Sequence, residues 1–214
     1  MRQRKDFKRQ ANIKSDRLII IAAEGRCTEN IYFNEMKLTL MHPRVHVEVL
    51  MRDDNNSSPE NVYEQIKEFE RTYDIGEEDQ LWVVVDTERW QEKKLYSVAQ
   101  FCSQSPSLYF CGSNTCFELW LLLHLEDIAA YSEEVRIQLA ENKKVYSQDT
   151  WLKHRMKELT GHYHESDYDA GSLLQNIDAA IQRAEDLDVN PADRWPQTVG
   201  TRVYLLAKSI MSFD

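Results

Sequence analysis

The chain has 214 residues, of which 42% are hydrophobic and 10% aromatic, and its formal net charge is −10. A chain of this length and apolar content can bury a sizeable core, which excludes wholesale disorder. The acidic balance argues against a general polyanion-binding surface, because lysine and arginine are the residues that neutralise phosphates.

The charges are unevenly distributed. Residues 1–17 contain seven Lys and Arg residues but only two Asp residues. We interpret residues 1–16 as a basic N-terminal arm, which is either a solvated terminus or a contact for nucleic acid or an acidic partner. The six apolar residues that follow are too few for a secretory signal, and no later stretch reaches the ~18 apolar residues of a membrane span. We therefore expect a cytoplasmic protein that does not enter a membrane.

Short β-rich stretches alternate with helical periods in the first part of the chain. They lie at 17–23, 45–51, 81–86 and 107–111. This alternation is typical of an α/β fold with a parallel sheet. The first and third stretches are continuous apolar runs, which predicts that they are covered on both faces and are neighbours in the middle of the sheet. The second stretch alternates polar and apolar residues and suits an edge.

The segments between these strands have helical patterns. Helices are predicted near 28–41, 59–74 and 90–102, and a fourth begins after the last strand. Ser58 is a predicted N-cap ahead of Pro59, and Thr28 is a candidate cap for the first helix. Thr115 and Glu118 have the spacing of a capping box at the start of the fourth helix.

The strand pattern stops after about residue 125. Helices are predicted near 131–141, 149–160, 169–187 and 199–212. We assign residues 17–125 to an α/β core with a mostly parallel four-stranded sheet, and residues 126–214 to a helical extension packed on the core. The pattern by itself is also compatible with a separate helical cap.

Acidic residues stand where the two most apolar strands end. Glu24 follows the first strand directly, Asp86 ends the third, and Glu88 comes two residues later. Ligands of open α/β sheets bind at the carboxyl ends of the strands, next to the point where the strand order reverses. Glu29, in the first turn of the following helix, is expected at the same edge. Carboxylates gathered in this way repel one another unless a cation intervenes, and oxygen ligands favour Mg²⁺ or Mn²⁺.

Four further residues are candidates for substrate binding. Arg26 and Arg89 flank the acids, where each either holds a phosphate or balances local negative charge. Asn114 and Glu118 follow the fourth strand near the start of a helix, which places them at the same edge of the sheet.

Two histidine-containing features have a structural interpretation. His124 is six residues from Glu118, about 120° around a helix, so the two cannot share a face and His124 is predicted to be packed in the core. The segment Gly161-His-Tyr-His-Glu165 has no third metal-ligating partner nearby in the sequence, so we interpret it as a loop.

Several segments resemble the RloB-like family, which is related to the TOPRIM domains of topoisomerases, primases and overcoming-lysogenization-defect nucleases. They are EGxxTE at 24–29, the Asp-x-acid pair at 86–88, SNTCFELWLLLH at 113–124 and PQTVGTRVYLL at 196–206. The resemblance implies a Rossmann-like TOPRIM core, Mg²⁺-dependent phosphodiester chemistry, and association with restriction or anti-phage defence loci, often beside an ATPase partner.

The resemblance also assigns roles to three acids. Glu24 matches the glutamate after the first TOPRIM strand, a general acid/base or metal ligand, and Asp86 matches the first aspartate of the Asp-x-Asp pair. Glu88 stands where the second aspartate would be. Glutamate is one methylene longer, and Mg²⁺ requires tight octahedral geometry, so this departure is expected to alter ion placement.

We interpret the chain as a metal-dependent nuclease acting on DNA or RNA, the effector of an anti-phage defence system. The alternative is a catalytically weak module that binds nucleic acid or docks on an ATPase. An intrinsic ATPase of the P-loop class is disfavoured because no GxxxxGK[ST] motif is present. The sequence leaves open the choice of DNA or RNA, the number of ions and the oligomeric state.

Overall fold

The computed structural model describes residues 16–51, 57–146 and 149–213. The predicted basic arm therefore lies outside the described residues, except for Asp16.

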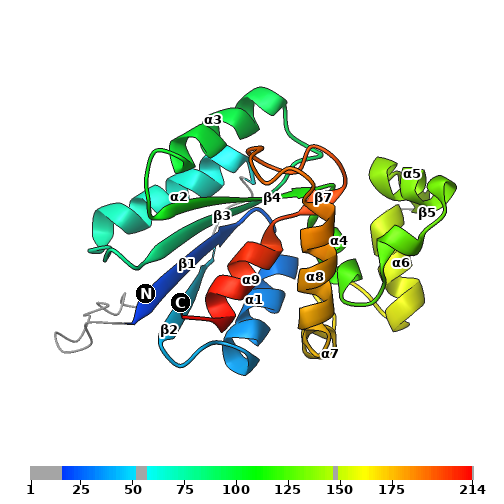
Figure 1. The fold of residues 1–214 in the computed structure, drawn as a ribbon, viewed down its shortest axis with the longest axis horizontal. Coiled ribbons are helices and arrows are strands. Elements are labelled where there is room, and N and C mark those ends of the chain that lie inside the picture. The colour runs from blue at the N-terminus through cyan, green and yellow to red at the C-terminus, as the bar shows by residue number, and fades with distance from the viewer. Residues whose placement is uncertain (1–15, 52–56, 147–148, 214) are drawn as a thin grey trace.

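A five-stranded sheet forms the centre of the molecule, with the strand order β2-β1-β3-β4-β7 (Figure 1). The first four strands run parallel, and β7 pairs antiparallel with β4. Their bounds are β1 Arg17–Ala23, β2 Val45–Leu50, β3 Gln80–Asp86, β4 Leu108–Asn114 and β7 Gly200–Thr201. The mostly parallel α/β fold and its four predicted strands are confirmed. The fifth strand was not predicted, because two residues are too short to show a periodic pattern.

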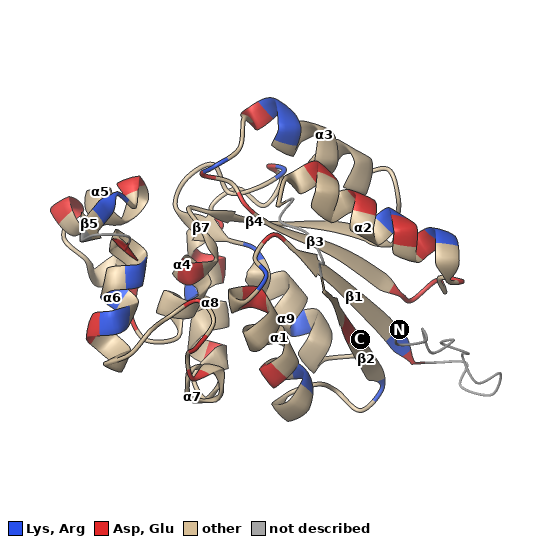
Figure 2. Ribbon diagram, turned by 180° about the vertical axis from the view of Figure 1, so that it is seen from behind, with Lys and Arg blue, Asp and Glu red and all other residues tan. Residues whose placement is uncertain are grey.

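The strand order also confirms the predicted neighbours. β1 and β3 lie side by side, with Ala23 opposite Val84, and β2 is at the edge of the sheet. The two central strands carry charged residues only at their ends (Figure 2). Their continuous apolar runs are needed because helices cover both faces of the sheet.

Two helical layers enclose the sheet (Figure 1). On one face α2 and α3 pack against side chains such as Ile20 and Val83. On the other face α1, α4, α8 and α9 form a larger core with side chains such as Ile19 and Ile21. The bounds are α1 Thr28–Thr39, α2 Pro59–Thr72, α3 Glu92–Cys102, α4 Phe117–Leu123, α8 Ile177–Leu187 and α9 Val203–Met211. Among the described residues, none of the helices is both long and apolar enough to cross a membrane.

The remaining elements come between α4 and α8 in the chain, with α6 packed against α4 and α7 packed against α1. They are the 3₁₀ turn η1 Ile128–Ala130, α5 Glu133–Glu141, the hairpin strands β5 Lys144–Tyr146 and β6 Asp149–Thr150, α6 Trp151–Thr160 and α7 Ala170–Leu174. A strand, β5, thus follows α5 where no strand was predicted, and the predicted helix at 169–187 is divided into α7 and α8. The chain after residue 125 returns to the sheet, since β7 pairs with β4 and α9 packs on the sheet face.

The helix caps differ in part from those predicted. Ser58 caps α2 as expected and accepts a hydrogen bond from the amide of Asn61 at 3.4 Å. The predicted caps at Thr28 and Thr115 are wrong, because the N-cap residues of α1 and α4 are Cys27 and Cys116 and neither side chain makes a capping bond. The Thr28 hydroxyl instead donates to a carbonyl of the loop after α6, which ties this loop to the start of α1.

Candidate active site

The carboxyl ends of β1 and β3 meet at the point where the strand order reverses. The chain leaves β1 for β2 on one side and returns to β3 on the other. Glu24 comes directly after β1, and Asp86 is the last residue of β3. The predicted convergence of these two acids is therefore confirmed, at the position where open α/β sheets bind their ligands.

Glu24 is held in place by the third strand and the loop that follows it. Its amide donates to the carbonyl of Val84 at 2.9 Å. Its Oε2 accepts from the amide of Asp86 at 3.1 Å and from the indole of Trp90 at 2.9 Å. Only 5% of Glu24 is exposed, so these contacts orient a nearly buried carboxylate.

Glu29 reaches the same place from the first turn of α1. Its Oε1 accepts from the amide of Gly25 at 2.9 Å. A Cβ atom at position 25 would lie 1.8 Å from Oε2 of Glu29, so this close approach requires glycine. The Glu-Gly pair after β1 thus makes room for a second acid.

The Asp-x-acid pair does not place both of its carboxylates in the pocket. Between them, Thr87 is turned inward, and its hydroxyl donates to the carbonyl of Ser113 at 3.2 Å. The Glu88 side chain accepts from Asn142 at 3.2 Å and lies 3.8 Å from the guanidinium of Arg89. Glu88 therefore contacts the segment after α5, beside the pocket.

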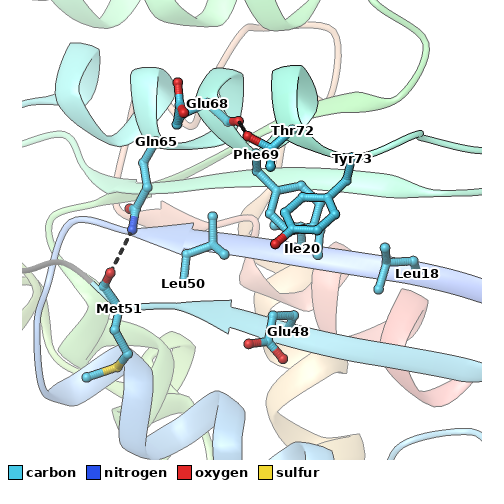
Figure 3. Close-up of a pocket in the computed structure, with 10 residues that line it drawn as sticks. All are labelled: Leu18, Ile20, Glu48, Leu50, Met51, Gln65, Glu68, Phe69, Thr72 and Tyr73. Atoms are coloured by element: carbon cyan, nitrogen blue, oxygen red, sulfur yellow. Dashed lines mark hydrogen bonds between the residues drawn. The ribbon is translucent and has the colours of Figure 1, made fainter. Parts of the chain in front are cut away.

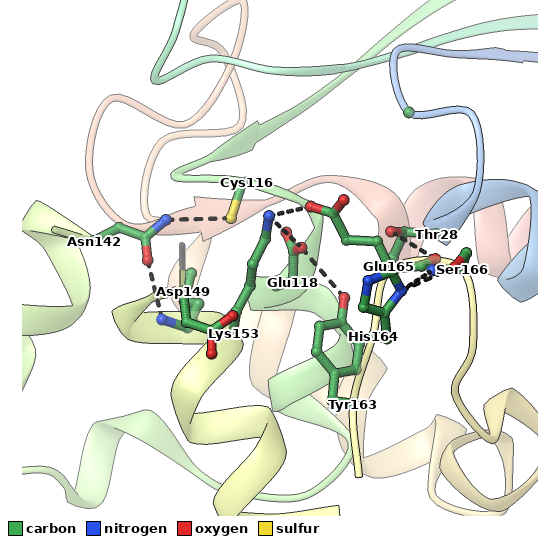
Figure 4. A network of polar contacts seen from close by, with 12 residues as sticks. Thr28, Cys116, Glu118, Asn142, Asp149, Lys153, Tyr163, His164, Glu165 and Ser166 are labelled. Atoms are coloured by element: carbon green, nitrogen blue, oxygen red, sulfur yellow. Dashed lines mark hydrogen bonds and ion pairs between the residues drawn. The ribbon is translucent and has the colours of Figure 1, made fainter. Parts of the chain in front are cut away.

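Glu118, from the first turn of α4, supplies the fourth carboxylate. Its Oε1 accepts from the hydroxyl of Tyr163 at 3.2 Å, and the ammonium of Lys153 lies 4.0 Å away (Figure 4). Lys153 also pairs with Glu165. Glu118 therefore faces the loop after α6, which explains why it does not close the predicted capping box.

These side chains surround a pocket of about 270 Å³. Among the predicted residues, Arg26 and Arg89 line it together with Glu24, Glu29, Asp86 and Glu118. Asn114 does not line it, because its amide donates to the carbonyl of Pro196 at 3.1 Å and so anchors the segment before β7.

Burial and mutual repulsion raise the pKa values of two of these acids. Burial, followed by the charges of Glu118 and Glu24, raises the pKa of Glu29 to about 7. Burial, followed by the charges of Glu29, Glu24 and Glu118, raises the pKa of Asp86 well above its usual value. The four carboxylates therefore lie close enough to disfavour full ionisation unless a cation offsets their charge.

The donor set of the pocket suits a hard cation, because it consists of carboxylate oxygens. In the described part of the chain, however, no three His, Cys, Asp or Glu side chains are arranged to hold a metal ion. Glu24 and Glu29 each direct an oxygen at groups of the protein itself, namely Trp90, the amide of Asp86 and the amide of Gly25. The chemistry of the residues fits Mg²⁺ or Mn²⁺, and their side chains would have to turn to bind it.

A second hollow of about 490 Å³ lies between α2 and the strands β1 and β2 (Figure 3). Its lining is mainly apolar and includes Ile20, Leu50 and Phe69. Its acids, Glu48 and Glu68, come from opposite walls, β2 and α2. This hollow offers little for catalysis, so the pocket at the switch point is the candidate active site.

Sequence reasoning missed several residues that support the acids. Trp90, Asn142 and Lys153 contact them from segments with no local motif. The segment at 161–165 contributes through Tyr163 and Glu165, while His162 contacts Asp167 and His164 contacts Ser166. Its interpretation as a loop is confirmed, but its part in the site depends on contacts with α4 and α6.

His124 is packed in the core as predicted. Its ring contacts the hydroxyl of Tyr32 and the carbonyl of Trp120, each at 2.9 Å, and it is 2% exposed.

Comparison with known proteins identifies one family for the chain. No curated protein and no solved structure matches the chain. The model of the RloB-like protein family matches residues 19–210, from β1 to α9. Because this match covers most of the chain and all of the acidic pocket, the chain belongs to the RloB-like protein family.

Proposed function

We propose that the chain is a divalent-metal-dependent nuclease with a TOPRIM-type core, which hydrolyses phosphodiester bonds of DNA or RNA. The observation that carries this proposal is the gathering of Glu24, Glu29, Asp86 and Glu118 around one pocket at the switch point of the sheet. A pocket of buried carboxylates costs stability, and binding a cation is the use that offsets this cost.

The ion would be Mg²⁺ or Mn²⁺, held by Glu24 and Asp86 with help from Glu29 and Glu118. When bound, it would neutralise the substrate phosphate and lower the pKa of an attacking water. The protein's own residues orient these ligands. Trp90 fixes Glu24 from one side, and Tyr163 fixes Glu118 from the other.

In this arrangement Glu118 takes the place expected for the second acid of the Asp-x-acid pair. Glu88 contributes from outside the pocket, where it contacts Asn142 and Arg89. The guanidinium groups of Arg26 and Arg89 line the pocket and are the cations that would meet a phosphate as it enters.

The biological setting is proposed from the family resemblance alone. The chain would be a cytoplasmic effector of an anti-phage defence system and would act together with an ATPase partner. The net charge of −10 makes a partner or a metal ion important for the approach to a polyanion.

A second function, a catalytically weak nucleic-acid-binding or partner-docking module, is favoured by one observation. The oxygens of Glu24 and Glu29 are engaged by groups of the protein itself, and no three acids of the described chain are arranged around an ion.

Incubation of the purified protein with DNA and RNA pools in Mg²⁺ or Mn²⁺, with and without the ATPase partner, tests the proposal. Cleavage by the wild type should be lost in Glu24→Gln and Asp86→Asn but retained in Glu48→Gln, which removes an acid from the edge strand β2. Cleavage that persists in the first two variants would contradict the site. Binding without cleavage under every condition would support the docking module.

A further inference from the structure

A lysine from the part of the chain after residue 125, Lys153, contacts two acids that line the acidic pocket, Glu118 and Glu165. Lys153 lies in the first turn of α6, and its side chain is 17% exposed. Its ammonium group is 4.0 Å from Oε1 of Glu118 and pairs with the carboxylate of Glu165 (Figure 4). Burial lowers the pKa of Lys153, but Glu165 and Glu118 together raise it above its usual value, so the group is cationic at neutral pH.

The two partners of Lys153 differ in their surroundings. The Glu118 side chain is 7% exposed and is hydrogen-bonded to Tyr163, whereas the Glu165 side chain is 50% exposed. Glu118 is therefore a fixed part of the pocket. Glu165 lies at its mouth, on a loop anchored to α1 through the hydroxyl of Thr28.

We propose that Lys153 binds a phosphate of the nucleic-acid backbone and that Glu165 occupies this ammonium group until the phosphate displaces it. This inference rests on the proposed function, because it assumes that a phosphodiester enters the acidic pocket. The Glu165 side chain is half exposed, so its ion pair with Lys153 is weak and a phosphate can replace the Glu165 carboxylate at little cost. The same exchange removes one negative charge from the path of the substrate.

A purely structural role for the pair is the competing interpretation. In that case Lys153 and Glu165 would only hold the loop at 161–168 against α6. The two interpretations predict opposite effects of removing Glu165 on nucleic-acid binding. If the pair is structural, removing either partner weakens binding. If Glu165 competes with the phosphate, removing Glu165 strengthens binding.

The test measures the affinity of the full chain for a short fluorescein-labelled single-stranded oligonucleotide by anisotropy, with Ca²⁺ in place of Mg²⁺. Glu165→Gln should tighten binding about 2- to 5-fold, the equivalent of losing a competing exposed ion pair. Lys153→Met should weaken binding about tenfold, and Lys153→Arg should restore most of it. Thermal melts of all variants check that the fold is retained.

Glu158→Gln is the matched control. It removes the same charge from α6, the helix that carries Lys153, where Glu158 pairs with Arg155 instead. Removal of any acid slightly raises the affinity for a polyanion. The gain in oligonucleotide affinity in Glu165→Gln must therefore exceed the gain in Glu158→Gln. The decisive comparison is the double variant, because in the Lys153→Met background Glu165→Gln should give no larger gain than Glu158→Gln.

Each result separates this inference from the proposed nuclease activity. The inference would be overturned by equal gains in Glu165→Gln and Glu158→Gln, by a gain in Glu165→Gln that still exceeds that of Glu158→Gln without Lys153, or by no binding of any variant. If the predicted affinities are found but no metal supports cleavage, the phosphate site stands and the nuclease proposal fails. If cleavage requires Glu24 while Glu165→Gln binds no better, the nuclease proposal stands and this inference fails.

Discussion

The indole nitrogen of Trp90 lies 2.9 Å from Oε2 of Glu24 and donates a hydrogen bond to it. The same oxygen accepts from the amide of Asp86, so two donors fix one carboxylate at the end of the central strand. Groups that orient a metal ligand in this way strongly affect metal affinity.

Replacing Trp90 with Phe removes this donor and keeps an aromatic ring. We expect Trp90→Phe to lower Mg²⁺ affinity about tenfold, the lower end of the effect of losing an orienting contact. Isothermal titration calorimetry measures the change. Trp195→Phe is the control, since Trp195 belongs to the same hydrophobic core as Trp90 but packs beside Phe110. Equal losses of Mg²⁺ affinity in the two variants would mean that the loss does not depend on the hydrogen bond to Glu24.

The second prediction compares two glutamates. Glu118 lines the pocket and Glu88 does not. Glu118→Gln should therefore reduce the rate of cleavage by about 100-fold or more, the scale of losing a group that acts directly in the reaction. Glu88→Gln should reduce the rate of cleavage by about tenfold or less, as expected for a residue that only supports the site. Single-turnover cleavage rates give the ranking, and the reverse order would restore Glu88 to the role implied by the Asp-x-acid motif.

The third prediction concerns stability in the absence of a metal ion. Glu29 is one of four carboxylates that repel one another, and glutamine can still accept the hydrogen bond from Gly25. Glu29→Gln should raise the free energy of unfolding in EDTA near pH 8 by roughly 1 to 2 kcal/mol, and it should reduce the stabilisation by Mg²⁺. Urea denaturation measures both effects. Glu35→Gln, on the same helix, should change neither, and a destabilised Glu29→Gln would contradict the proposed repulsion.

The fourth prediction concerns acid sensitivity. Burial lowers the pKa of His124 to about 4, although the hydrogen bond with the carbonyl of Trp120 opposes this shift. The unfolded chain binds a proton at His124 more readily than the folded chain does. The contribution of neutral His124 to the free energy of unfolding is therefore complete above about pH 6.5 and is lost as the pH falls toward 4. Between pH 7 and 4.5 this loss is roughly 2 kcal/mol.

His124→Gln isolates this contribution. Its free energy of unfolding from urea titrations should depend less on pH over this range than that of the wild type, although the variant is less stable at pH 7. His162→Gln, which changes an exposed ring, should keep the wild-type dependence. Parallel curves for wild type and His124→Gln would show that the acid sensitivity arises elsewhere.

The sheet and the location of the site could be predicted because their signals are local. The apolar runs that end at Ala23 and Asp86 are covered on both faces, and such strands are central and neighbouring in the observed order. Once those strands are placed, the position of Glu24 follows from the way parallel strands end at one edge.

The composition of the site could not be predicted to the same extent. Glu118 contacts Tyr163, and Glu88 contacts Asn142, across 45 and 54 residues of sequence. Nothing local to any of these residues indicates its partner. The spacing of Thr115 and Glu118 instead indicated a capping box, because a local pattern is read without the tertiary contacts that override it.

The return of the chain to the sheet after residue 125 has a consequence for any shortened form of the protein. Removing α8 and α9 would leave part of the face that carries Ile19 and Ile21 open to water, because α1 and α4 cover only the rest of it. A contiguous apolar surface of that kind adheres to other copies of itself. A fragment ending near residue 125 would therefore aggregate, and coexpression with the missing segment would be needed to keep it in solution.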